Sequence, residues 1–193
     1  MIEYIIVVLA CSLFGLQHSG LSAWRIKTGI IKRWGKTGYA RIFTITSIFT
    51  LLIAFLSMNF RNWFYFILAP ATINLALLMF GVISGVLGAV LAVMASRVIS
   101  VSTVADMQPD RKAELITSGL YSRIRHPLYL AVFLLFGALA LIYPFPVVIV
   151  FSLSMISYTI IGAYLEEKKL IKYYGDEYLE YKKKTGFILP KLR

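Results

Sequence analysis

Five apolar segments, separated by short polar connections, dominate the pattern of hydrophobic and polar positions along the chain. They run from Tyr4 to Leu21, Ile42 to Met58, Phe64 to Ala95, Leu128 to Tyr143 and Phe145 to Tyr164. A bilayer core is crossed by about 20 helical residues, with about 17 tolerated, so four of these segments can span as they stand. The pattern therefore predicts an all-α integral membrane protein with five transmembrane helices.

Prolines refine the third segment and the last two. The third is longer than one span, and Pro70 divides it, so we expect a short interfacial piece, Trp63 to Ala69, before a helix that starts near Ala71. The fourth is slightly short, and Tyr143-Pro144-Phe145-Pro146 joins it to the fifth without a charged residue. This combination predicts a tight C-terminal helical hairpin whose turn lies at the far membrane face.

Composition supports a membrane protein and limits its partners. Hydrophobic residues make up 59% of the 193-residue chain, more than a soluble core needs. The net charge of +11 comes from basic residues in short segments between the apolar runs, as is typical of loops facing anionic lipid. We therefore expect membrane lipid as a partner and no nucleic acid. The single cysteine, Cys11, lies inside the first apolar segment, so we expect neither a disulfide nor a bound metal.

The distribution of Lys and Arg predicts the orientation. The connection from Arg25 to Arg41 holds six basic residues and no acid, whereas the connection after the second helix offers only Arg61. Because the more basic side normally stays cytoplasmic, the N-terminus should lie outside, and Ser96 to Arg125 and the C-terminal tail inside. The N-terminus lacks the basic start of a signal peptide, so we expect the first helix to be retained. The chain reads as a multi-pass protein of a prokaryotic cell membrane.

Two further patterns concern packing. Gly81, Gly85 and Gly88 lie on one face of the third predicted helix, a spacing that lets a neighbouring helix approach closely. The tail from Glu166 to Lys184 alternates acids and bases at helical spacing, with tyrosines between them. It predicts a cytoplasmic amphipathic helix that folds back against the membrane surface. We interpret residues 1–193 as a single domain, with a three-helix N-terminal part at 1–95.

Candidate chemistry gathers at the cytoplasmic ends of the hairpin. Pro127 is well placed at the first turn of a helix, so Arg125 and His126 should lie in extended backbone near its N-terminus, where amides favour an anion. Tyr129 can share the face of His126, and Glu166-Glu167 returns two carboxylates to the same interface. The alternative is that these residues only anchor helix ends, through snorkelling arginine and interfacial tyrosine. Their combination favours a pocket with cationic and anionic walls.

This region resembles a known enzyme family. The motifs are Leu115-Ile116-Thr117-Ser118-Gly119-Leu120-Tyr121, Arg125-His126-Pro127-x-Tyr129, Glu166-Glu167-x-x-Leu170 and Tyr174-Gly175-Asp176-Glu177-Tyr178. Together they are similar to the C-terminal half of isoprenylcysteine carboxyl methyltransferase and its relatives, which include phospholipid N-methyltransferases and small-thiol S-methyltransferases. The resemblance covers about the last eighty residues. It implies that 96–193 is a cofactor-binding part and that the cofactor is S-adenosylmethionine.

The resemblance also implies roles for individual residues. The cofactor would be walled by Leu115, Ile116 and Tyr121 and contacted by His126, Pro127 and Tyr129, with Glu166 holding a polar or cationic group and Glu167 beside it. The chemistry is compatible, since a carboxylate stabilises the sulfonium and ammonium of S-adenosylmethionine. Its own carboxylate can be accepted by Arg125 or by a helix N-terminus.

One departure from the family bears on the methyl acceptor. Carboxyl methyltransferases of this family have an arginine four residues before the first glutamate, placed to bind the substrate carboxylate; this chain has Gly162. The segment Phe14-Gly15-Leu16-Gln17-His18-Ser19 instead resembles the methanethiol S-methyltransferase group. We therefore expect a small or lipophilic thiol as acceptor, with Glu166 and His18 as the catalytic residues and His18 deprotonating or orienting the nucleophile. The alternative for His18 is a histidine satisfied by a neighbouring carbonyl or water.

Three other functions stay open at this point. The first is an isoprenylcysteine-type carboxyl O-methyltransferase. The second is a nicotinamide-dependent reductase of the sterol type, although the sequence has no dinucleotide glycine fingerprint. The third is a non-enzymatic membrane accessory factor, for example in nitrogen-oxide metabolism.

Overall fold

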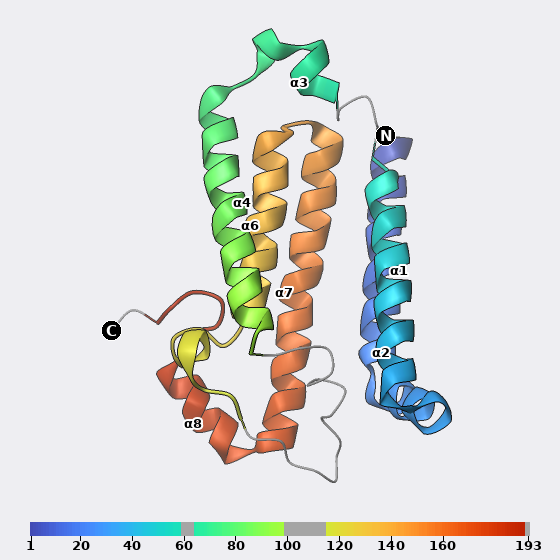
Figure 1. Cartoon of the computed structure of the whole chain (residues 1–193), viewed down its shortest axis with the longest axis vertical. Helices are drawn as coiled ribbons and strands as arrows, with labels where there is room; N and C mark the ends of the chain where they lie inside the picture. The colour runs from blue at the N-terminus through green and yellow to red at the C-terminus, as the bar shows by residue number, and fades with distance from the viewer. Residues whose placement is uncertain (59–63, 99–114, 192–193) are drawn as a thin grey trace.

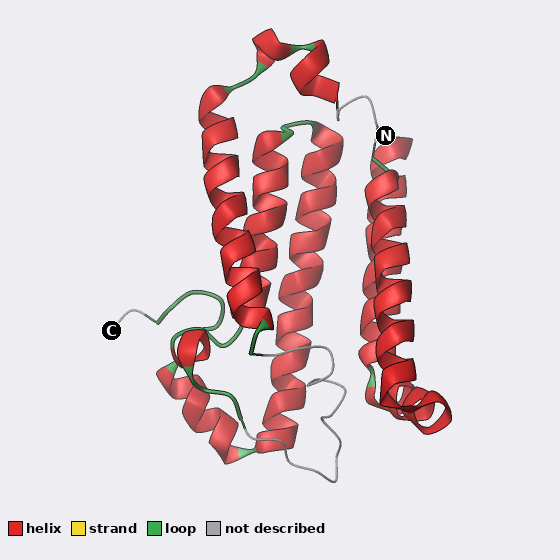
Figure 2. Ribbon diagram, viewed as in Figure 1, coloured by secondary structure: helices red, strands yellow, loops and turns green. Residues whose placement is uncertain are grey.

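The computed structural model describes residues 1–58, 64–98 and 115–191. Within these ranges the chain consists of helices joined by loops, and no strand is formed (Figure 2). The elements are α1 (Ile2–Ser22), α2 (Trp24–Leu56), α3 (Tyr65–Leu68), η2 (Pro70–Thr72), α4 (Leu75–Ser96), η3 (Gly119–Ser122), α6 (Pro127–Ile142), α7 (Pro146–Tyr174) and α8 (Asp176–Lys184). Arg61 and Trp63, on which two sequence predictions depended, lie outside the described residues.

Five apolar helices confirm the all-α integral membrane fold. Helices α1, α2, α4 and α7 are each long and apolar enough to cross a membrane. Helix α6 has 16 residues, about 24 Å at 1.5 Å per residue, and is therefore short for a hydrocarbon core of about 30 Å. It forms the predicted hairpin with α7, and Phe145 donates a backbone hydrogen bond of 2.8 Å to the carbonyl of Tyr143 in the turn.

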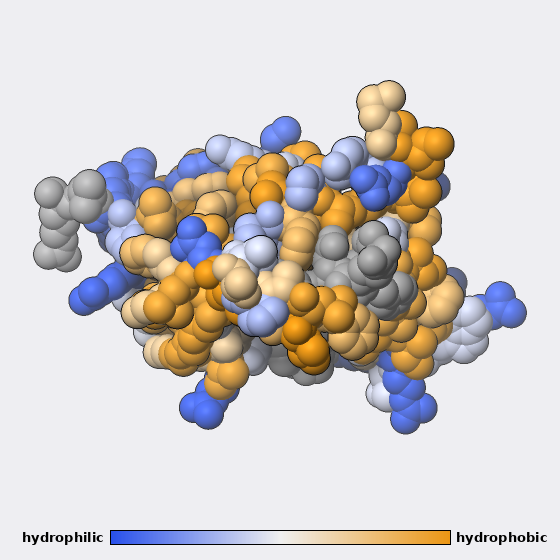
Figure 3. Space-filling view, turned by 90° about the horizontal axis from the view of Figure 1, so that it is seen from above, coloured by the Kyte–Doolittle hydropathy of each residue, from blue (hydrophilic) through white to orange (hydrophobic). Residues whose placement is uncertain are grey.

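The helices pack as a row in the order α2, α1, α7, α6 and α4 (Figure 1). The elbow between α1 and the transmembrane part of α2 lies at the same end of the row as α8. Near the opposite end, buried apolar side chains of α1 and α7 form a core with Ala54 and Met58 of the α2 region. Seen from that end, apolar side chains predominate, with hydrophilic side chains among them and at the margins (Figure 3). The long helices expose many large apolar side chains, as a lipid-facing exterior requires.

Two helix boundaries differ from the sequence prediction. Helix α2 begins at Trp24 instead of Ile42, so most of the expected basic connection is itself helical and is interrupted at Gly35, whose φ of 69° leaves the helical region. Helix α4 begins at Leu75, after η2, because Asn74 caps it by accepting a hydrogen bond of 3.1 Å from the Leu77 amide.

The predicted tail helix is divided between two elements. Residues from Glu166 to Tyr174 continue α7 beyond the membrane part of the hairpin, and α8 begins only at Asp176. Gly175 separates them with a φ of 63°, a conformation that glycine adopts without steric cost. The two carboxylates of Glu166 and Glu167 are therefore held on the long α7 helix, while α8 is free to turn back toward them (Figure 1).

The glycine face of α4 packs on α6, as its spacing predicts. A Cβ atom added at Gly88 would lie 3.0 Å from the carbonyl oxygen of Ala131, and one at Gly81 would lie 2.6 Å from the Ile142 side chain. Ser84 on the same helix donates a 3.0 Å hydrogen bond to the carbonyl of Leu134. Close backbone approach therefore fixes the α4–α6 pair.

We expect Gly88→Ala to destabilise the fold. Its methyl group must move the backbone of α6, and overpacking of this kind costs about 1–3 kcal/mol. Thermal unfolding of the full chain in one detergent should show a lower midpoint for this variant. Gly137→Ala is the matched control because an added Cβ there meets nothing within 4 Å. Equal midpoints for the two variants would contradict the proposed packing.

Candidate active site

The candidate site lies where the start of α6 meets the C-terminal segment. The backbone from Arg123 to His126 runs beside Gly186 and Phe187 and forms a parallel bridge with them. The Arg125 amide donates to the carbonyl of Gly186 at 2.9 Å, and the His126 amide donates to that of Phe187 at 3.1 Å. Pro127 occupies the first turn of α6, as predicted. The segment after α8 thus holds the Arg-His-Pro backbone in place.

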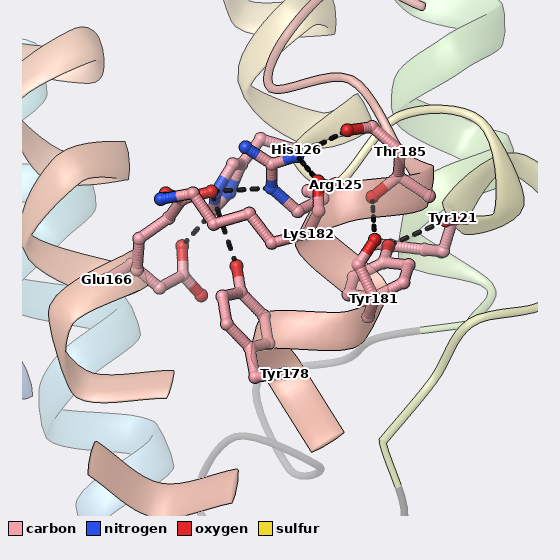
Figure 4. A network of polar contacts seen from close by, with 9 residues as sticks. Tyr121, Arg125, His126, Glu166, Tyr178, Tyr181, Lys182 and Thr185 are labelled. Atoms are coloured by element: carbon pink, nitrogen blue, oxygen red, sulfur yellow. Dashed lines mark hydrogen bonds and ion pairs between the residues drawn. The ribbon is translucent and has the colours of Figure 1, made fainter. Parts of the chain in front are cut away.

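Glu167 is the centre of a buried ion-pair network, and its partners Arg125, Lys182 and Tyr178 are labelled in Figure 4. Its Oε1 accepts a hydrogen bond of 2.6 Å from Arg125 Nε, and its Oε2 accepts one of 2.6 Å from Lys182 Nζ. Arg125 also donates through Nη1 to the carbonyls of Lys182 and Thr185, at 3.2 and 2.5 Å. The Arg125 and Glu167 side chains are only 6% and 5% exposed. This network connects α6, α7 and α8 and occupies both side chains.

Glu166, the neighbouring carboxylate, is in a different environment. Its side chain is 43% exposed, and its Oε2 lies 3.7 Å from His126 Nδ1. Adjacent residues of a helix project about 100° apart, so only one of the two glutamates can face Arg125. Glu166 is therefore the accessible carboxylate of the pair.

His126 lies between the two glutamates. Its side chain is 3% exposed, and burial lowers its pKa to about 4, so the imidazole is neutral at neutral pH. Nε2 lies 3.6 Å from Glu167 Oε1, too far for a hydrogen bond, and this buried atom has no hydrogen-bond partner in the described structure. The ring packs against Tyr129 and Phe187, with centroids 5.3 and 5.0 Å away. A buried ring nitrogen in this state has a hydrogen bond to offer a ligand.

Tyrosine side chains surround the Glu166 carboxylate. Burial and the nearby Glu166 charge raise the pKa of Tyr121 to about 12, so its hydroxyl keeps its proton. The Tyr129 hydroxyl is also close enough to interact with the Glu166 carboxylate. Tyr121, His126, Tyr129 and Glu166 are therefore brought together as the sequence led us to expect.

Leu115 and Ile116 lie at the start of the last described range, and both are half-buried. Leu115 packs on a second cluster, formed by Tyr174, Tyr178 and Tyr181 around the α7–α8 break. Tyr178 connects this cluster to the ion-pair network, since its hydroxyl lies 3.5 Å from Glu167 Oε1. Leu115 is therefore near the network through Tyr178, and no described contact joins it directly to Glu166.

His18 belongs to another polar group, formed by α1 and α2. Its Nδ1 is hydrogen-bonded to Ser47 Oγ at 3.0 Å. Gln17 beside it donates to Thr46 Oγ1 at 2.7 Å and accepts from Thr50 at 2.9 Å. The side-chain hydrogen-bond partner of His18 is thus the Ser47 hydroxyl of α2, and the partners of Gln17 are two threonine hydroxyls of the same helix. Tyr158 of α7 lies against the same ring, with centroids 6.4 Å apart.

Three residues of the site were missed in the sequence. Lys182 lies in the tail for which the sequence predicted only an amphipathic surface helix, and Thr185 and Phe187 lie just beyond that helix. The charge alternation of the tail gave no indication of which lysine turns inward. Gly186 was a usable signal of close backbone packing in the tail. The Leu189 carbonyl leaves no room for a side chain at this position.

Comparison with known proteins identifies the family of the chain. Residues 76–177, more than half of the chain, match the model of the phospholipid methyltransferase family. The chain belongs to the phospholipid methyltransferase family. The matched range begins in α4, includes all of α6 and α7, and ends just after the start of α8. It thus contains every candidate residue of the hairpin, and the resemblance read from the motifs is confirmed at the level of the family.

Methanethiol S-methyltransferases are among the relatives of this phospholipid methyltransferase family member. Those of Pseudomonas deceptionensis and Pseudomonas sp. strain GM41(2012) are 39% and 36% identical to it over 79 and 72 residues. Methanethiol S-methyltransferase 1 of Bradyrhizobium diazoefficiens is 35% identical over 78 residues. These matches cover 40%, 37% and 38% of this chain but only 29%, 27% and 25% of the relatives. No solved structure matches the chain significantly.

Proposed function

We propose that this membrane protein transfers the methyl group of S-adenosylmethionine to a small or lipophilic thiol. The observation that carries the proposal is the difference in environment between two adjacent carboxylates. Glu167 is neutralised by Arg125 and Lys182, whereas Glu166 is accessible and lies beside His126, Tyr121 and Tyr129. An accessible carboxylate among aromatic rings suits a cationic ligand.

The residues present fit this methyl donor. Glu166 can stabilise its sulfonium or ammonium group, and the buried His126 Nε2 has a hydrogen bond to offer. The rings of Tyr121 and Tyr129 offer an aromatic wall for adenine. Arg125, which the sequence suggested for the donor's carboxylate, is occupied by Glu167 and two carbonyls. We therefore assign Arg125 and Glu167 a positioning role, and Glu166, His126, Tyr121 and Tyr129 the direct contacts.

Methyl transfer requires little covalent catalysis by the protein. When bound, the donor supplies one methyl group, whose bond to the sulfonium breaks with its electron pair while a new bond forms to the thiol sulfur. The protein aligns the two sulfur atoms on opposite sides of the methyl carbon and keeps water out. A thiol has a pKa near 8.5 and reacts as thiolate, so a proton acceptor raises the rate at neutral pH. His18 Nδ1 is engaged by Ser47, so we assign Nε2 the thiol proton.

A thiol is preferred as acceptor for two reasons. The three relatives compared above are named for methanethiol, and Gly162 stands where the carboxyl methyltransferases that the motifs resemble have a carboxylate-binding arginine. We further propose that the site faces the cytoplasm. The basic α1–α2 elbow and α8 lie at one end of the helices, which the positive-inside rule assigns to the cytoplasmic side (Figure 1).

The full chain in detergent or nanodiscs tests this function directly. Calorimetric titration should give binding of S-adenosylmethionine and of its demethylated product, and no binding of a reduced nicotinamide dinucleotide. Incubation with methyl-labelled donor and a panel of alkanethiols, a prenylated cysteine and phosphatidylethanolamine should place the label in a thioether. Label in a base-labile ester would identify a carboxyl methyltransferase. Absence of binding by both adenosyl compounds would reject the methyltransferase proposal.

A further inference from the structure

Tyr158 of α7 connects the N-terminal polar group to the candidate donor site. Its hydroxyl is hydrogen-bonded to Ser19 Oγ of α1 at 3.0 Å, and its ring lies edge-on to those of Phe14 and His18, at 5.6 and 6.4 Å. A Cβ atom added at Gly15 would lie 2.8 Å from the ring, so the glycine is what allows the tyrosine to lie on α1.

On α7 the same face continues to the accessible carboxylate. Tyr158, Gly162 and Glu166 are spaced four residues apart, so they follow one another along one side of the helix. Tyr129 of α6 faces this stripe: its ring lies 3.7 Å from the position of a Cβ at Gly162, and its hydroxyl interacts with the Glu166 carboxylate. Tyr158 thus contacts the His18 ring, and Tyr129 lies beside Glu166 further along the stripe.

The side chains along this stripe are partly exposed. Among the described residues, only Tyr129 would meet an added Cβ at Gly162 within 4 Å, and Gly162, Tyr158, Glu166 and Tyr129 are all half-buried. Helices α1 and α7 move apart toward the α8 end of the molecule (Figure 1). Tyr158 and Ser19 join α7 to α1, and Gly162 lies about one helical turn further along α7 toward Glu166.

We propose that Tyr158, Ser19 and Gly162 form the binding site of the methyl acceptor, a small thiol, between α1, α6 and α7. This inference rests on the proposed function, and it names the place of the second substrate. Either hydroxyl can be the donor of the Ser19–Tyr158 hydrogen bond; when Ser19 donates to the Tyr158 oxygen, the phenol proton is left for the thiolate sulfur and stabilises its charge. The missing side chain at Gly162 provides the volume for the acceptor's carbon group. His18 lies on the α1 side of this site, where it receives the thiol proton.

The test measures thiol binding separately from donor binding. Trifluoroethanethiol serves as a ¹⁹F NMR probe of the full chain, with and without saturating S-adenosylhomocysteine, and calorimetry gives the affinity for that product. Tyr158→Phe should weaken probe binding about tenfold, the effect of one hydrogen bond to a charged group, and leave product affinity within about twofold. Tyr4→Phe, which removes a hydroxyl at the opposite end of α1, should change neither.

Substitutions of increasing size at Gly162 provide a test that is independent of Tyr158. Gly162→Ala makes only an ordinary contact with Tyr129 and should leave probe affinity within about threefold, whereas Gly162→Leu fills the space and should weaken it at least about tenfold. In turnover, Gly162→Leu should raise KM for long alkanethiols more than for methanethiol at nearly constant kcat.

The outcomes separate this inference from the proposed function. Unchanged probe affinity in both Tyr158→Phe and Gly162→Leu, or no probe binding by the unaltered chain in either condition, overturns the acceptor site. Equal losses of probe and product affinity also overturn it, because they indicate a general structural effect. Tyr158-dependent probe binding without any binding of the adenosyl compounds would retain the thiol site and reject the methyl donor.

Discussion

Glu166→Gln is expected to weaken binding of S-adenosylmethionine about tenfold to a hundredfold. The substitution keeps the shape of the side chain and removes one charge-assisted interaction, which is worth about 1.5–3 kcal/mol. Calorimetric titration of the variant and the unaltered chain measures the change. Glu180→Gln is the matched control, because its carboxylate is 59% exposed and pairs only with the exposed Lys183 in the described structure.

Comparing two ligands shows which cation Glu166 binds. The donor carries a sulfonium and an ammonium, whereas its demethylated product keeps only the ammonium. A larger loss of affinity for the donor than for the product would place Glu166 beside the sulfonium, and equal losses would place it beside the ammonium. Equal effects of Glu166→Gln and Glu167→Gln on the folded protein would mean that the wrong carboxylate has been assigned.

Glu167→Gln is expected to destabilise the fold more than it weakens the donor site. Removing this charge leaves the Arg125 guanidinium buried without its counter-charge, and breaking a buried pair in this way costs about 3–5 kcal/mol. Thermal unfolding in a single detergent should show a midpoint at least about 6 °C below that of the unaltered chain. Once folded, the variant should bind the donor with affinity close to normal.

Two variants show whether charge or packing is responsible. Glu180→Gln removes an exposed carboxylate of α8 and should leave the unfolding midpoint nearly unchanged, since exposed pairs contribute little. Lys182→Met keeps much of the side-chain volume and removes the second, partly exposed partner of Glu167. Its effect should be intermediate. A Glu167→Gln midpoint equal to that of Glu180→Gln would contradict the buried-network description.

The order and number of the apolar helices were predictable because the bilayer acts on composition. Each span must satisfy its own backbone hydrogen bonds and present apolar side chains to lipid, so length and hydropathy alone indicate helices. The close packing of the glycine face of α4 was equally predictable, since small residues at helical spacing in a membrane span mainly allow a neighbouring helix to approach closely. The ends of the helices were less predictable. Local polarity predicted a loop where α2 begins and one continuous tail helix, whereas the helices are interrupted at Gly35 and Gly175.

The sequence predicted which residues meet at the candidate site, but only partly which of them pair with one another. Arg125, His126 and the two glutamates were expected near one another because the hairpin returns its ends to one interface. Which glutamate Arg125 would bind could not be inferred, because the two differ by one position and the outcome depends on helix rotation. The inward turn of α8 brings Lys182 to that interface, and the segment after α8 brings Phe187. The charge pattern of the tail does not indicate this arrangement, and Gly186 alone pointed to a close backbone contact.

The sequence by itself determined a membrane-embedded helical protein, its C-terminal hairpin and its methyltransferase motifs, because these depend on hydropathy, proline positions and residue types within short segments. The tertiary structure alone decided that Glu167 is bound by Arg125 and Lys182, that Glu166 is accessible, and that Tyr158 meets Ser19 across two helices. The physical reason is that these properties depend on helix rotation and on contacts between residues far apart in the chain. Packing of whole helices fixes them, and no single segment encodes them.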